Sequence, residues 1–233
     1  MTASVRRAVR LEHRLTQPTA SLDDLEAAVA LATEHELASL TVNPWLVKAA
    51  KRQLGRSRVT LGTVIGFPHG GQLLSVKAFE ASKALEQGAT QIDFVLNAGA
   101  LASGDDEAVF NDMLAVVDMA HSALAAAGVI TEPDVAMAED LVRRACRLAE
   151  RAGADYVVTG PGNGTAAATV ARTRVLRDSV GPRIGVKAAG RFRNPDQILE
   201  ATKAGATRVS TRLTPTLARL AADDPTPAPA AAR

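Results

Sequence analysis

The chain has 233 residues, of which 47% are hydrophobic and only 3% are aromatic. This length and apolar content suffice for one sizeable core and argue against a largely disordered chain. The net charge of +2 and the single cysteine, Cys146, exclude a strongly basic nucleic-acid-binding protein and a disulfide-stapled secreted domain.

The N-terminal region carries the main basic cluster of the chain. Arg6, Arg7, Arg10 and Arg14 lie close together in the sequence, and we interpret them as the solvated face of a first helix. No apolar run reaches the length of a membrane span, and the N-terminus lacks the apolar segment of a signal peptide. We therefore expect a cytoplasmic protein that binds neither membranes nor nucleic acid.

A short pattern recurs along the chain and predicts parallel β-structure. Gly88, Gly153 and Gly205 each end a helical stretch and precede a short apolar strand. Helix, glycine and buried strand in this order are typical of βα units. Extending the pattern predicts eight strands, centred near Glu12, Leu40, Val64, Asp93, Ile130, Val158, Lys187 and Ser210.

Helices are expected between these strands. Their predicted ranges are 22–36, 44–54, 73–87, 106–127, 135–152, 166–178 and 195–204. Ser21, Asp105 and Asn194 stand where N-cap residues are favoured, and Pro195 suits a first helical turn.

These elements predict a (β/α)8 TIM barrel that forms a single domain over residues 1–222, followed by a disordered tail rich in Pro and Ala over residues 223–233. The fifth strand is expected to be shortened or irregular, because Pro133 closely follows the short run 128–131. An open, doubly wound sheet stays a live alternative.

Two charged residues interrupt predicted buried strands. Lys187 closes an apolar run, whereas the other five lysines lie in helical segments and are expected to be solvated. Asp93 breaks the fourth strand, and a buried carboxylate needs a cationic partner, for which Lys187 is the obvious candidate. We interpret both residues as catalytic, with a purely structural ion pair as the alternative.

Other motifs give weaker signals. The loop from Gly160 to Gly164 follows the sixth strand, and its backbone amides could approach a phosphate, although a plain flexible loop is equally compatible. It matches no nucleotide-binding pattern. The histidines lack metal-ligand spacing, and His69 lies in a predicted turn. The sequence thus indicates no metal site and no cofactor.

These residues together resemble the deoxyribose-phosphate aldolase family over about residues 9–215. The matching stretches are Leu11-Glu12-His13-Arg14-Leu15-Thr16-Gln17-Pro18-Thr19, Ser39-Leu40-Thr41-Val42-Asn43-Pro44, Gly66-Phe67-Pro68-His69-Gly70, Ile92-Asp93-Phe94-Val95-Leu96-Asn97, Ala152-Gly153-Ala154-Asp155-Tyr156-Val157 and Gly185-Val186-Lys187-Ala188-Ala189-Gly190. The resemblance implies a TIM barrel that cleaves 2-deoxyribose 5-phosphate reversibly through a Schiff base. Asp93 matches the proton-transferring aspartate, and Lys187 matches the lysine that tunes the nucleophile.

The nucleophile itself is missing from the match. Val158 stands at the position of the Schiff-base lysine and has no amine with which to form an imine. Gln17 and Glu12 replace a lysine and an aspartate of the family, and the fifth-strand region loses its lysine but keeps Glu132. Near the family's phosphate site, the glycine pair reads Gly190-Arg191, and Arg212 enters the eighth-strand motif.

We therefore expect a diverged aldolase-like lyase that acts on a small carbonyl or phosphorylated sugar-like substrate through Lys187 and Asp93. Lys187 would serve either as the working amine or as a cation that stabilises an enolate, and Asp93 would shuttle protons. Standard 2-deoxyribose 5-phosphate cleavage is expected to be weak or absent, because covalent catalysis needs the missing amine. The alternative is a non-catalytic ligand-binding or regulatory barrel, and a homodimer stays open. The expected substrate-binding residues are Glu12, Asn43, Thr159, Gly162, Gly190, Arg191 and Arg212.

Overall fold

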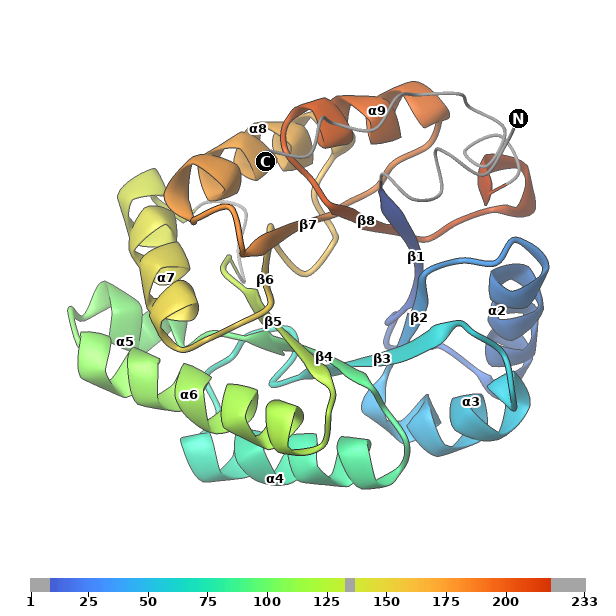
Figure 1. Ribbon diagram of the computed structural model, residues 1–233, viewed down its shortest axis with the longest axis horizontal. Coiled ribbons are helices and arrows are strands. Elements are labelled where there is room, and N and C mark those ends of the chain that lie inside the picture. Colours follow the sequence, from blue (N-terminus) through green and yellow to red (C-terminus); the bar gives the residue numbers. More distant parts are fainter. Residues whose placement is uncertain (1–8, 133–136, 219–233) are drawn as a thin grey trace.

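The structure, a computed structural model, describes residues 9–132 and 137–218. Eight parallel strands close into a barrel in which each strand pairs with the next and β8 pairs with β1 (Figure 1). The predicted TIM barrel is confirmed, and the alternative of an open, doubly wound sheet is wrong. The predicted tail, 223–233, lies outside the described residues.

The strands are short, as expected for segments that each cross one barrel wall. Their bounds are β1 Arg10–Leu15, β2 Ser39–Val42, β3 Thr60–Ile65, β4 Gln91–Val95, β5 Ala126–Ile130, β6 Tyr156–Val158, β7 Gly185–Ala189 and β8 Arg208–Thr211.

Helices surround the barrel in Figure 1 and connect its successive strands. Their bounds are α2 Leu22–Glu34, η1 Pro44–Leu46, α3 Val47–Leu54, α4 Leu74–Glu86, α5 Ala98–Ala102, α6 Asp106–Ser122, α7 Glu139–Arg151, α8 Ala166–Ser179 and α9 Pro195–Lys203. Three predicted caps are present: the side chains of Ser21, Asp105 and Asn194 accept hydrogen bonds from backbone amides at the starts of α2, α6 and α9.

The fifth strand differs from its prediction. β5 is five residues long, pairs regularly with both neighbours and begins at Ala126, inside the range predicted as helix. The shortest strand is instead β6, with three residues. Gly128 weakened the strand signal, yet in the structure a Cβ at this position would lie 2.0 Å from Cε2 of Tyr156. Close packing of that ring therefore accounts for the glycine.

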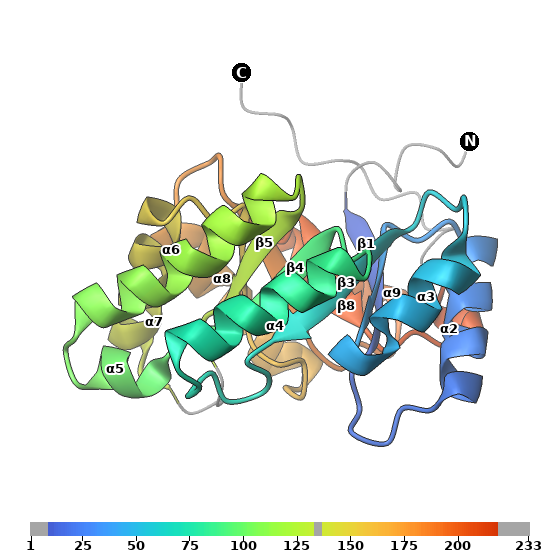
Figure 2. The same ribbon diagram turned by 90° about the horizontal axis from the view of Figure 1, so that it is seen from below.

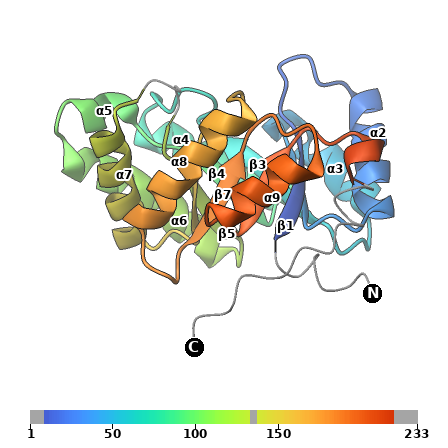
Figure 3. The same cartoon turned by 90° about the horizontal axis from the view of Figure 1, so that it is seen from above.

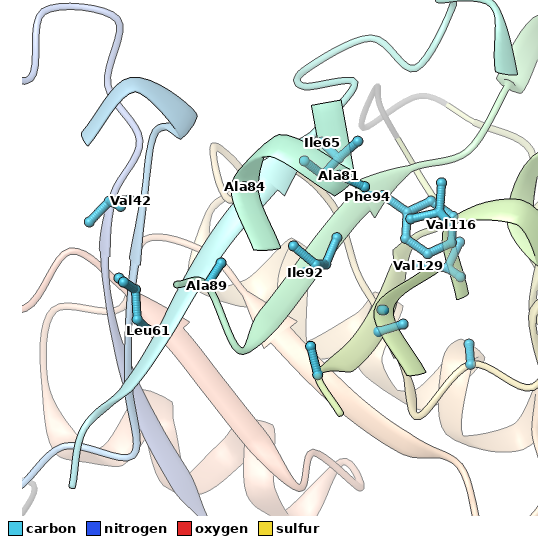
Figure 4. Packing of buried hydrophobic residues seen from close by; sticks show 14 of the residues in the cluster. Val42, Leu61, Ile65, Ala81, Ala84, Ala89, Ile92, Phe94, Val116 and Val129 are labelled. Atoms are coloured by element: carbon cyan, nitrogen blue, oxygen red, sulfur yellow. The ribbon is translucent and has the colours of Figure 1, made fainter. Parts of the chain in front are cut away.

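The largest apolar core lies between the barrel wall and the helices. Ile65 of β3 and Ile92 of β4 lie against the small residues Ala81 and Ala84 of α4, whereas Val129 of β5 lies beside Phe94 and Val116 (Figure 4). Phe94 and Val116 of α6 meet in the same layer. Because this core takes the outward positions of the strands, the barrel interior is left to the alternate residues. Cys146 is fully buried in this core, as expected for a small apolar residue, and burial raises the pKa of its thiol to about 12.

The described part of the basic N-terminal cluster is not a helix face. Arg10 and Arg14 both lie in β1, while Arg6 and Arg7 lie outside the described residues. In the part of the chain that the structure describes, no helix combines the length and apolar character needed to cross a bilayer.

Candidate active site

Charged residues occupy the middle of the barrel interior. Glu12, Asp93 and Lys187 are each the third residue of their strands, β1, β4 and β7. Strand residues alternate between the inside and the outside of a barrel, and these three point inward from different sides. Glu12 and Lys187 have no exposed surface, and the Asp93 side chain is 7% exposed.

Lys187 is held between two carboxylates. Its Nζ donates to Oδ2 of Asp93 at 2.6 Å and lies 2.6 Å from Oε2 of Glu12. The predicted contact between Asp93 and Lys187 is therefore present. Because an ammonium group in this position interacts favourably with both anions, the geometry favours Lys187 as a cation over Lys187 as a free amine.

Arg208 completes the charge balance. Its Nη1 donates to Oε1 of Glu12 at 2.9 Å and to Oε1 of Gln91 at 2.8 Å. Burial works to raise the pKa of Glu12, but Lys187 and Arg208 outweigh it, and the pKa lies below its ordinary value. Two cations and two anions thus form a compact buried cluster, which we call the charge cluster: Glu12, Asp93, Lys187 and Arg208.

Tyr156 fixes the second oxygen of Asp93. Its hydroxyl donates to Oδ1 of Asp93 at 2.5 Å, and its ring lies between the cations, 5.0 Å from Lys187 Nζ and 4.4 Å from Arg208 Cζ. Burial, reinforced by the neighbouring Asp93 charge, raises the pKa of Tyr156 well above its ordinary value. Tyr156 therefore stays a neutral hydrogen-bond donor to Asp93. Neither Tyr156 nor Arg208 was singled out from the sequence.

Val158 lies beside the charge cluster in an apolar wall. Its Cα is the register partner of Lys187, and its buried side chain packs with Val95, Ile130 and Ala189. This wall spans β4 to β7. The interior therefore places the carboxylate of Asp93 beside a hydrocarbon surface, with no second amine at the Val158 position.

Arg14 crosses the mouth of the barrel. It lies two residues beyond Glu12 on β1, so both side chains face inward. Its Nη1 and Nη2 donate to the carbonyl oxygens of Pro161 and Gly162, at 2.9 and 2.7 Å, in the loop between β6 and α8. The loops after β1 and β6 leave the same end of the barrel (Figures 2 and 3). The sequence interpretation of Arg14 as a solvated helix residue is therefore wrong.

The other predicted binding residues are distributed around this mouth. Asn43 donates through Nδ2 to the carbonyl oxygen of Gln17 at 2.9 Å. The side-chain amide of Gln17 has one orientation in which both its oxygen and its nitrogen face suitable partners. In this orientation the oxygen lies 2.8 Å from Nη1 and 3.0 Å from Nε of Arg212. Gly190 packs against Thr169, and the Arg191 amide donates to the Gly164 carbonyl. Arg191 and Arg212 are both exposed, and neither contacts the charge cluster.

A cavity of about 560 Å³ opens next to the β6–α8 loop. Thr159, Gly162, Arg172 and Glu132 are among its lining residues. Arg172 donates to Oε1 of Glu132 at 2.8 Å, so Glu132 is engaged away from Lys187. The cavity therefore adjoins the Arg14-bound loop and does not include Asp93 or Lys187.

Two further expectations concern single side chains. His69 is exposed, as expected for a turn residue. Lys77, in contrast, was expected to be solvated but is fully buried and pairs with Asp112 on α6 at 2.6 Å. Its Nζ also donates to the Val95 carbonyl. Lys77 thus ties α4 to α6 and β4, outside the barrel interior.

His13 gives the mouth a pH-dependent element. Burial, together with the cations Arg212 and Arg14, lowers its pKa from 6.5 to about 4. Its Nδ1 accepts a hydrogen bond from the Leu213 amide at 3.0 Å, which only an unprotonated Nδ1 can do. Folding therefore excludes a proton that the unfolded chain binds between these two pH values.

We expect the free energy of unfolding to fall by about 3 kcal/mol as the pH drops from 6.5 to 4 because of His13 alone. The sign follows because the unfolded state binds more protons in this window. Urea unfolding at several pH values measures this effect. In His13→Asn, whose side-chain oxygen can accept from the Leu213 amide, the free energy of unfolding should fall less steeply as the pH is lowered. The same fall in both proteins would contradict the role of His13.

TIM-barrel enzymes build their active sites at the carboxyl ends of the strands, which is the end where Arg14 contacts the β6–α8 loop. The profile of the DeoC/LacD family aldolases matches residues 8–206. A deoxyribose-phosphate aldolase from Thermococcus gammatolerans is 42% identical over 203 residues, covering 86% of this chain and 90% of that protein. One from Streptococcus pneumoniae is 41% identical over 201 residues, covering 86% and 90%.

Solved aldolase structures are similar to this fold. QR15, an aldolase, superposes with a TM-score of 0.83 at 30% identity, covering 93% of this chain and 95% of its own. A deoxyribose phosphate aldolase from Aeropyrum pernix, described as tetrameric, gives a TM-score of 0.83 at 27% identity, covering 96% and 92%. The chain belongs to the DeoC/LacD aldolase family.

Proposed function

We propose that this protein is a lyase-type enzyme that transfers a proton to and from a small carbonyl or phosphorylated sugar-like substrate without forming an imine. Asp93 removes a proton from the carbon next to the carbonyl, becoming protonated as an enolate forms. Lys187 stabilises the developing negative charge as a cation. Standard 2-deoxyribose 5-phosphate cleavage is absent or several orders of magnitude slow in this proposal.

The position of Lys187 is the observation that carries the proposal. Carboxylate oxygens of Glu12 and Asp93 lie 2.6 Å from its nitrogen, and these contacts are more favourable for a cation than for a neutral amine. Asp93 accepts one hydrogen bond at each oxygen, which leaves further lone pairs for a substrate proton. Its side chain also keeps slight exposure, unlike those of Lys187 and Glu12.

Exchange of protons for deuterium in candidate carbonyl compounds tests this chemistry without knowledge of the physiological substrate. Acetaldehyde, pyruvate and glyceraldehyde 3-phosphate would be incubated in D2O and followed by proton NMR. We expect enzyme-dependent exchange in at least one of them, reduced about a hundredfold or more in Asp93→Asn. Exposed Asp118→Asn serves as the matched control. Exchange that is equal in Asp93→Asn and the wild type would contradict the proposed role.

A non-catalytic ligand-binding barrel is the second candidate. It is favoured by the balanced charge cluster and by Arg14, which crosses the mouth above it. Absence of exchange across the whole panel, with ligand binding retained, would favour this candidate.

We also propose a cytoplasmic location and small-molecule partners. The one cysteine of the chain, Cys146, is buried and free, which fits a reducing compartment. A homodimer is the assembly that we propose to test, because Leu73, Val76 and Phe79 provide exposed apolar side chains at and near the start of α4.

A further inference from the structure

Arg14 is bound by neutral groups only. Its two hydrogen bonds go to the carbonyl oxygens of Pro161 and Gly162. None of the ion pairs among the described residues involves Arg14. Burial lowers its pKa to about 10, partly offset by Asp93, so the guanidinium stays charged at neutral pH. Arg14 is half-buried, and a cation that is partly withdrawn from water without a bonded anion is costly to maintain.

The β6–α8 loop fits closely around this cation. Gly162 has a φ of +88°, a conformation that favours glycine. A Cβ at Gly162 would lie 1.1 Å from Nη1 of Arg14, so any side chain there would displace the guanidinium. The two carbonyls thus fix the orientation of the guanidinium plane. Three of its five N–H groups are left for other acceptors.

A second cation, Arg212, lies near Arg14 on the β1 side. Arg212 and Arg14 both act electrostatically on His13, which places the two cations near the same ring. His13 itself is neutral at pH 7, and the carboxylate of Asp93 is already bound to Lys187 and Tyr156. On the side formed by β4 to β7, the interior is lined by the apolar wall of Val95, Ile130, Val158 and Ala189.

We propose that Arg14 is an anion-binding residue that receives the phosphate or carboxylate of the substrate, so that the substrate class is a small anionic carbonyl compound. The anionic group lies on the guanidinium fork, and the reacting carbon lies against Asp93 and the apolar wall. The carbonyl part of this assignment rests on the proposed function, whereas the anion site does not.

Calorimetric titration with inorganic phosphate and with pyruvate tests the site directly. We expect at least one of these anions to bind the wild-type protein in low-salt buffer. The tighter of the two identifies the group that the site prefers. In Arg14→Met the affinity should fall about tenfold to a hundredfold, the usual effect of losing hydrogen bonds to a charged group. Exposed Arg183→Met should bind like the wild type.

A second variant protects the test against misfolding. Arg14→Lys keeps the charge but loses the planar fork, and it should bind the preferred anion several-fold more weakly than the wild type. Affinities unchanged in both Arg14 variants, or no binding of either anion to the wild-type protein, would overturn the site. If the wild-type protein binds an anion through Arg14 but catalyses no deuterium exchange, only the proposed function is overturned.

Discussion

Replacing Lys187 with methionine should lower the free energy of unfolding by about 3–5 kcal/mol. The substitution removes the cation that lies 2.6 Å from both Glu12 and Asp93 and leaves two carboxylates with one remaining cation, Arg208, on the Glu12 side. Both carboxylates lack water as a substitute partner because they are almost fully buried. Chemical denaturation in urea at neutral pH measures the effect.

The matched control is Lys48→Met, which makes the same change at an exposed position and should alter stability by no more than about 0.5 kcal/mol. Adding Asp93→Asn to the Lys187 variant should recover part of the loss, because Glu12 keeps Arg208 as its partner while Asp93 is the carboxylate that loses its bonded cation. A loss below about 1 kcal/mol in the Lys187 variant would mean that the charge cluster is not formed as described.

Replacing Val158 with lysine should raise 2-deoxyribose 5-phosphate cleavage by several orders of magnitude over the wild-type protein. The new amine would emerge from the apolar wall next to Lys187. Burial among Val95 and Ile130 and the neighbouring cation both lower the pKa of an introduced amine, which makes it nucleophilic at neutral pH. Release of acetaldehyde, coupled to a reductase assay, measures the rate.

Val158→Met is the control, because it has similar length and no amine. It should stay as slow as the wild type. Circular dichroism would verify that both variants fold, since a longer side chain in a packed wall costs about 1–3 kcal/mol. If the folded lysine variant gains no cleavage, the missing amine is not the reason for the weak activity that we expect of the wild type.

Much of the barrel follows from local sequence patterns. Glycines such as Gly88 and Gly153, at positive φ after α4 and α7, mark the helix ends that made the βα repeat visible. The fifth strand was underestimated because Gly128 has low strand propensity, whereas its reason lies in the ring of Tyr156 from the next strand. Contacts between strands are tertiary and cannot be derived from the periodicity of one segment.

The site shows the same division. A buried charge needs a partner of opposite charge, and this requirement predicted the contact of Asp93 with Lys187. The same reasoning applies to Arg14. Alternation along β1 places Arg14 on the same face as Glu12, a signal that grouping it with other arginines concealed. Lys77 similarly shares a buried helix face with Ala81 and Ala84. The position of Arg208 depends on barrel closure, which no local sequence pattern predicts.

The central claim, that Lys187 works as a buried cation and that no imine forms, is tested most directly by reductive trapping. Wild-type protein would be treated with borohydride and 2-deoxyribose 5-phosphate, acetaldehyde or pyruvate, then digested and analysed by mass spectrometry. We predict unmodified peptides at Lys187 with every compound, while Val158→Lys is trapped at residue 158. A substrate-dependent reduced adduct on Lys187 of the wild-type protein would contradict the account.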